Sequence, residues 1–165
     1  MATLTATLKA LFNAQYSATP DLGGAGWTSG DAGIYSRSIA NGTGLNQANK
    51  VFQDHGATGT TYDLDAGTML DPLGVAIPAF TRIVAIMIDA PATNTLPVAV
   101  SGDFLLSKLL TGWVDDAASI PVYPGGCFLY VAPTVAGVAV TAGTGDVITV
   151  TPSGTEEFDV LVLGS

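Results

Sequence analysis

Charged side chains are scarce in this 165-residue chain, at 12% of residues, and positive charges are scarcer than negative ones. Five lysines and arginines stand against 14 aspartates and glutamates, which gives a net charge of −9. Binding to nucleic-acid phosphates requires clustered cations. The five cations here are far apart in the sequence: Lys9, Arg37, Lys50, Arg82 and Lys108. We therefore expect neither a nucleic-acid partner nor an anionic membrane surface.

Cysteine is almost absent as well, and the single residue excludes an internal disulfide. Cys127 lies in the tetrapeptide GCFL, whose apolar neighbours favour a small buried side chain over a reactive thiol. No uninterrupted apolar stretch reaches about 18 residues, and the N-terminus lacks the pattern of a signal peptide. We expect a protein made in a reducing cytoplasm and not inserted into a membrane.

Groups for catalysis are also few. His55 is the only histidine, so a catalytic triad would have to use it. It lies in the polar tripeptide DHG, which favours an exposed histidine in a turn. Cys127 as a nucleophile would need this histidine nearby. We therefore expect no enzyme and no cofactor, although a small hydrolase that uses Asp63, Asp65 or His55 stays a minor alternative.

The carboxylates do not form a recognisable metal or acid–base motif. Asp63 and Asp65 alternate near a turn, with Asp71 downstream, but the spacing and distal glutamate of an EF-hand are missing. Solvated turn aspartates explain them better than a surface calcium site. Two adjacent acidic pairs also occur, Asp115-Asp116 and Glu156-Glu157. Adjacent strand residues point to opposite faces, so we interpret both pairs as solvated turn residues.

Short apolar segments fill the second half of the chain, with Gly, Pro, Asn, Asp or Thr between them. This spacing is typical of an all-β sandwich or barrel. The expected strands are residues 81–89, 96–100, 120–131, 137–141, 146–152 and 158–163. Residues 45–54 fit a short helix or an irregular strand, and residues 104–113 fit a loop or helical turn. Residues 71–74 (DPLG) predict a turn with proline at its second position.

Some expected strands are apolar on both faces. In residues 83–88, we expect Ile83 and Met87 on one face and Val84, Ile86 and Ile88 on the opposite face. Residues 158–163 alternate in the same way. An antiparallel sheet with one solvated face needs only one apolar face per strand. We interpret the second apolar face as an oligomer contact, with Ile83 and Met87 as candidate contact residues.

The beginning of the chain has a different composition. We expect residues 1–33 to form an irregular N-terminal arm and loop, and residues 34–165 to form the β-sandwich domain. Residues 1–14 fit a helix or a strand, whereas residues 17–33 have the glycine and proline content of a long loop. Trp27 in that loop either packs on the protein's own core or anchors a partner. Trp27, Tyr35 and Trp113 are the aromatic candidates for partner contacts.

Two groups of sequence segments together resemble a known class of proteins. The first is IANGTGLNQANKVF at residues 39–52, followed by YDL at residues 62–64. The second comprises FTRI at 80–83, YPGGCFL at 123–129, VTAGTGD at 140–146 and VLVLG at 160–164. They resemble small virion structural proteins of tailed bacteriophages, especially capsid decoration (cement) proteins. The resemblance covers about residues 39–164.

This resemblance implies an antiparallel, jelly-roll-like β-sandwich on the outer capsid surface of a virion. It implies a homotrimer at a three-fold position that binds the major capsid protein and stabilises the head. On this hypothesis the N-terminal arm and Trp27 contact the capsid, and the apolar strands form the core and the trimer contacts. Two alternatives stay open: a receptor- or glycan-binding head or tail-fibre module that uses Trp27 or Trp113, and a tail or baseplate structural protein.

Overall fold

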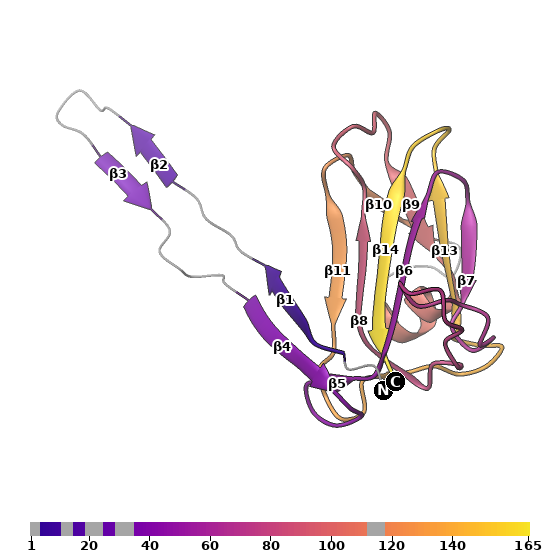
Figure 1. Ribbon diagram of the computed structural model, residues 1–165. Coiled ribbons are helices and arrows are strands. Elements are labelled where there is room, and N and C mark those ends of the chain that lie inside the picture. The colour runs from indigo at the N-terminus through magenta and orange to yellow at the C-terminus, as the bar shows by residue number, and fades with distance from the viewer. Residues whose placement is uncertain (1–3, 11–14, 19–24, 29–34, 112–117) are drawn as a thin grey trace. The chain divides into compact units, whose positions relative to one another are not determined.

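The computed structural model describes residues 4–10, 15–18, 25–28, 35–111 and 118–165. The fold is all-β and sandwich-like, as predicted, and its sheets are almost entirely antiparallel (Figure 1). The chain divides into two compact units. One is Thr5–Ile39, and the other is Ala40–Ser165 together with Leu4. The expected boundary after residue 33 falls within the first unit.

The described residues of the unit Thr5–Ile39, which we call the ribbon, form two antiparallel strand pairs. Strand β1 (Ala6–Ala10) pairs with β4 (Tyr35–Asn41), and β2 (Gln15–Ala18) pairs with β3 (Ala25–Thr28). The segment that fitted a helix or a strand is therefore a strand at Ala6–Ala10. The expected irregular loop contains paired strand residues, so this part of the arm is more regular than glycine and proline content predicted.

The larger unit is built on two sheets. The first has the strand order β11-β8-β14-β6, with β12 also paired to β8, and the second has the order β10-β9-β13-β7. Figure 1 shows the four strands of the first order side by side. The first sheet comprises β6 (Lys50–Gly56), β8 (Arg82–Asp89), β11 (Cys127–Val131), β12 (Val138–Ala139) and β14 (Phe158–Gly164). The second comprises β7 (Thr60–Asp63), β9 (Val98–Ser101), β10 (Ile120–Val122) and β13 (Val147–Pro152).

One hydrophobic core lies between these sheets. Alternate residues of the first sheet, such as Ile86 and Val160, meet alternate residues of the second, such as Ile148 and Val150. All four are fully buried, and each such side chain contributes about 1.5–3 kcal/mol of burial free energy. The short π-helix η1 (Phe104–Leu109) adds two buried side chains to the same core. It occupies the segment that fitted a loop or helical turn.

An irregularity in β8 changes which face Ile83 occupies. Along β14, Leu163 pairs with Ala85, but the next residue, Gly164, pairs with Ile83, so Val84 is passed over. This bulge shifts the alternation by one residue. Ile83 therefore joins Ile86 in the core and is fully buried. The expectation that Ile83 shares a face with Met87 and contacts a partner was wrong.

Two other segments differ from the expected strands. Residues 120–131 form two strands in different sheets, because a turn with a hydrogen bond from Gly126 N–H to Tyr123 O at 2.8 Å separates them. Gly125 in this turn has a φ of +74°, which favours glycine. Residues 45–54 form no helix: β5 (Gln47–Ala48) pairs in parallel with β4, and most of the remainder belongs to β6.

Candidate functional site

The strongest candidate for an interaction site is the outer face of the first sheet, the face directed away from the core. The strand register arranges this face in three rows across β11, β8, β14 and β6. The middle row is Leu129, Met87, Leu161 and Gln53. The second row is Val131, Ala85, Leu163 and Val51. The third row is Cys127, Asp89, Asp159 and His55.

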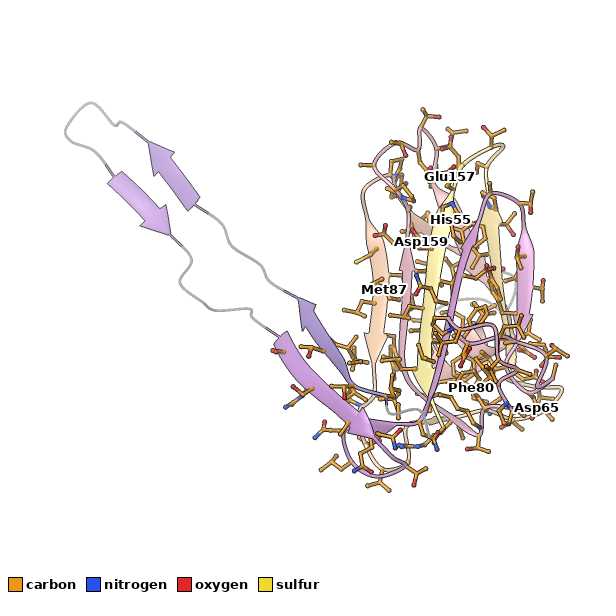
Figure 2. The ribbon with its side chains drawn as sticks, viewed as in Figure 1. His55, Asp65, Phe80, Met87, Glu157 and Asp159 are labelled. Atoms are coloured by element: carbon orange, nitrogen blue, oxygen red, sulfur yellow. The ribbon has the colours of Figure 1, made fainter. Side chains whose placement is uncertain are left out.

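Two of the three rows are apolar. Ala85 and Leu163 at the centre of the second row are buried, so the middle row carries the apolar side chains that reach solvent at the centre of this face, where an antiparallel sheet usually has polar residues. Met87, Leu129 and Leu161 are partly exposed and adjacent in register. Figure 2 labels Met87 on β8 within this face. We call the three residues the outer apolar row. The expected second apolar face therefore exists in the structure, and Met87 lies at its centre.

The third row gives this face a polar end. Asp89 lies opposite Asp159 in the register of β8 and β14. Asp159 Oδ1 lies 3.0 Å from Nδ1 of His55, and both side chains are at least 40% exposed. Figure 2 shows His55 and Asp159 beside one another. An exposed pair of this kind adds little stability. His55 is exposed, as expected, but it belongs to a strand and not to a turn.

Cys127 lies at the other end of this polar row, and its side chain is exposed. The expectation of a buried thiol was wrong because apolar neighbours in sequence do not set the face of a strand residue. Alternation in β11 places Phe128 against the core, so Cys127 and Leu129 lie on the outer face.

Two of the three aspartates considered for calcium, Asp63 and Asp71, accept hydrogen bonds within turns. Asp63 Oδ1 accepts hydrogen bonds from the N–H groups of Asp65 and Ala66, both at 3.0 Å. Asp71 Oδ1 accepts from the N–H groups of Leu73 and Val75. Within the part of the chain that the structure describes, no three His, Cys, Asp or Glu side chains come together as a metal site.

Glu156 is buried, so its interpretation as a solvated turn residue was wrong. Its carboxylate accepts hydrogen bonds from the Thr95 hydroxyl at 2.7 Å and the Thr95 N–H at 2.9 Å, and a longer one from Leu96 N–H. The hydroxyl and N–H of Thr95 hold the pKa of Glu156 below its usual value. Its neighbour Glu157 is exposed, as expected. The acidic pair Asp115-Asp116 lies outside the described residues.

A second polar contact lies at the edge of the core. Tyr62 donates its hydroxyl hydrogen to Asp54 Oδ2 at 2.7 Å, and its ring packs against Phe52 with centroids 5.2 Å apart. Burial, the hydrogen bond and the charge of Asp54 raise the pKa of Tyr62 well above its usual value. Tyr62 is thus held as the neutral phenol, which is a structural role.

The aromatic candidates for partner contacts come from different segments. Trp27 occupies a position in β3 directly opposite Tyr16 of β2. Tyr35 begins β4, opposite Ala10. Trp113 lies outside the described residues. Of the five candidate contact residues, Met87 is the one whose side chain is both described and partly exposed on a surface.

No protein-family model, curated protein or solved structure matches this chain. Among the described helical residues, none form a helix of the length and apolarity that a membrane span requires.

Proposed function

We propose that the protein is a structural component of a virion, a capsid decoration (cement) protein that binds the outer capsid surface and bridges capsomers as a homotrimer. The outer apolar row is the observation that carries the proposal. Met87, Leu129 and Leu161 form an apolar patch on a sheet face, and such patches mark contacts between subunits. The resemblance of residues 39–164 to decoration proteins supports the capsid as the place of assembly.

The mechanism is mechanical clamping. A packaged genome presses outward on the shell, and a trimer that bridges adjacent capsomers adds contacts that must break before they separate. Many modest contacts then sum to a large resistance. The net charge of −9 favours solubility of the free protein and limits nonspecific association before assembly.

The two units take different tasks in this proposal. The outer face of the larger unit meets neighbouring copies, and the ribbon Thr5–Ile39 meets the major capsid protein. Tyr16 and Trp27 occupy opposed register positions, so the two aromatic positions belong to one face of the ribbon. An isolated two-stranded ribbon is only marginally stable in water. A capsid surface against this ribbon would therefore stabilise it.

Light scattering on the full-length protein, followed by co-sedimentation with empty capsids of the encoding phage, tests the proposal. We expect a stable trimer that sediments with capsids. Met87→Glu places a charge in the outer apolar row and should give a monomer. Gln53→Glu changes the exposed polar residue at the end of the middle row, next to Leu161. It is the matched control and should keep the trimer. A wild-type monomer that ignores capsids would refute the proposed function.

A further inference from the structure

A second surface lies on the narrow hairpin of residues 70–76, which we call the apolar turn. The two residues that flank it, Met69 and Ile77, are buried in the main core. Ile77 N–H donates to Met69 O at 2.8 Å, and Asp71 N–H donates to Val75 O at the same distance. The turn is thus fixed at its base by core packing and by a short antiparallel ladder.

Its tip is held as firmly as its base. Asp71 Oδ1 accepts from Leu73 N–H at 2.9 Å and from Val75 N–H at 2.8 Å, and Gly74 N–H donates to Asp71 O at 2.8 Å. Gly74 has a φ of +78°, a left-handed conformation that favours glycine. Because the tip is already ordered, a partner would lose little conformational entropy by binding it.

This rigid tip presents apolar side chains to solvent. Leu73 is 80% exposed, Val75 61% and Leu70 50%. They are three of the seven large hydrophobic residues that are exposed in the described part of the chain, and they fall within six positions. Turn formation requires only Asp71, Pro72 and Gly74. The three apolar side chains are therefore not explained by the fold and indicate a contact surface.

A groove of about 280 Å³ lies next to this tip. Most of its lining is apolar: Leu4, Val51, Pro72, Leu73, Ala76, Ile77 and Pro78. Small-molecule sites usually measure about 300–1,000 Å³. This groove lies at the lower end of that range, and its apolar lining can accept one or two inserted apolar side chains.

The groove has one charge of each sign at its rim, Lys50 and Asp71. Within the described residues, neither takes part in an ion pair. Lys50 donates to Ala79 O and lies 5.7 Å from the centre of the Phe80 ring. Asp71 Oδ1 accepts the two hydrogen bonds within the turn. The rim thus offers both an unpaired cation and an unpaired anion.

We propose that this surface joins two copies of the chain around a two-fold axis. Leu73 of each copy would enter the groove of the other, and Lys50 of each copy would face Asp71 of the other. A knob and a groove on one surface are complementary to themselves, as a two-fold contact requires. The opposite charges at the rim set the orientation. This contact goes beyond the capsid role, since it doubles a monomer, and it doubles a trimer when its two-fold axis is perpendicular to the three-fold axis.

Sedimentation of the full-length protein over a wide concentration range tests the proposal. We expect the mass of the basic unit to double as concentration rises, and we expect added salt to weaken the doubling. Leu73→Asp should lower the association constant at least tenfold. Leu96→Asp is the matched control, because Leu96 is also 50% exposed but lies in the loop before β9. Circular dichroism of both variants verifies that they are folded.

Three results would overturn the two-fold contact. The first is an unchanged mass at every concentration. The second is a Leu73→Asp variant that associates as the wild type does; a trimer insensitive to Leu73 would then leave the proposed function standing. The third is a Leu73→Asp variant that keeps its self-association but no longer sediments with capsids, which would make the capsid protein the occupant.

Discussion

Arg82 donates its Nε–H to the hydroxyl of Ser165 at 2.7 Å, and the Ser165 N–H returns a bond to the Arg82 carbonyl at 3.0 Å. The remaining four guanidinium N–H groups donate to main-chain carbonyls of two other segments. These acceptors are Thr134 and Val135 for Nη1, and Gly44 and Gln47 for Nη2. All five donors are used although Arg82 is only 7% exposed. One side chain thus fastens three separate segments.

Replacing this arginine should be costly. Arg82→Lys supplies three donors in place of a planar fork of five, so carbonyls in the loops lose their partners. We expect a loss of about 3 kcal/mol or more in unfolding free energy. Lys108→Met removes a half-buried cation whose ammonium makes one side-chain hydrogen bond, to Thr141 Oγ1, and should change stability by about 1 kcal/mol or less. Urea unfolding measures the unfolding free energy of both variants. Equal losses would contradict the conclusion that Arg82 holds three segments together.

Gly102 is a position where a side chain cannot fit. Its φ is +108°, and an added Cβ would lie 2.4 Å from the carbonyl oxygen of Val147. Gly143 also has a positive φ, of +72°, but open space around it. We expect Gly102→Ala to cost about 3 kcal/mol or more, and Gly143→Ala about 1–2 kcal/mol from backbone strain alone. Thermal unfolding compares them, and similar melting temperatures would refute the steric argument.

Tyr62 should make stability fall at alkaline pH. Its pKa is raised in the folded protein, so above about pH 10 the unfolded chain releases a proton that the folded chain keeps. That contribution to stability is present below about pH 10 and is lost as pH rises further. Tyr62→Phe should flatten the decline between about pH 10 and 12 and cost about 1 kcal/mol at neutral pH. Tyr123→Phe is the control, because Tyr123 is exposed. It should leave the stability at neutral pH unchanged.

Glu156 should make the stability of the protein fall at acidic pH. Its pKa is lowered in the folded protein, so its contribution is present above about pH 4.3, the usual unfolded value. The contribution is lost as pH falls through the lower folded value. Glu156→Gln should therefore be less stable than the wild type at neutral pH, with a difference that shrinks on acidification. Glu157→Gln, an exposed neighbour, is the control; a constant difference for Glu156→Gln would contradict the linkage.

Cys127 offers a chemical test of the outer face. Its side chain is exposed, so we expect a thiol reagent to modify it in the native protein without denaturant. If neighbouring copies cover the outer face, Met87→Glu should make Cys127 react faster than it does in the wild type. Absorbance of the released chromophore follows both rates. A thiol that reacts only after unfolding, even in the Met87→Glu variant, would contradict its position in the strand.

The local sequence pattern predicted where most strands lie, but it did not always predict which side chains of a strand face the core. Residues 158–163 alternate without interruption, so the predicted faces of Val160 and Leu161 are confirmed. Ile83 was placed on the wrong face because a bulge depends on the partner strand, which the sequence of β8 does not reveal. The face of Cys127 likewise follows from its pairing with Asp89. Pairing between distant segments, and not propensity, decided these positions.

The candidate site was predictable in kind but not in detail. Apolar residues on both faces of two strands predicted a second apolar face, and Met87 lies on that outer face; its contact with a partner stays a prediction. Leu129 was not identified, because its row is formed only when β11 pairs with β8. The contacts of Arg82 were also missed, since four of its five acceptors are main-chain carbonyls, which leave no pattern in the side chains.

The position of β14 has a consequence for how the protein folds during synthesis. This strand lies between β8 and β6, and it joins Phe158 to Gly56 across about a hundred residues of chain. Until the ribosome has released residues 158–164, β6 has no neighbour in the first sheet. Closing so long a loop is slow because its entropy must be lost before the pairing compensates. The nascent chain should therefore keep an open apolar sheet edge until late, when it is most prone to aggregation and most dependent on chaperones.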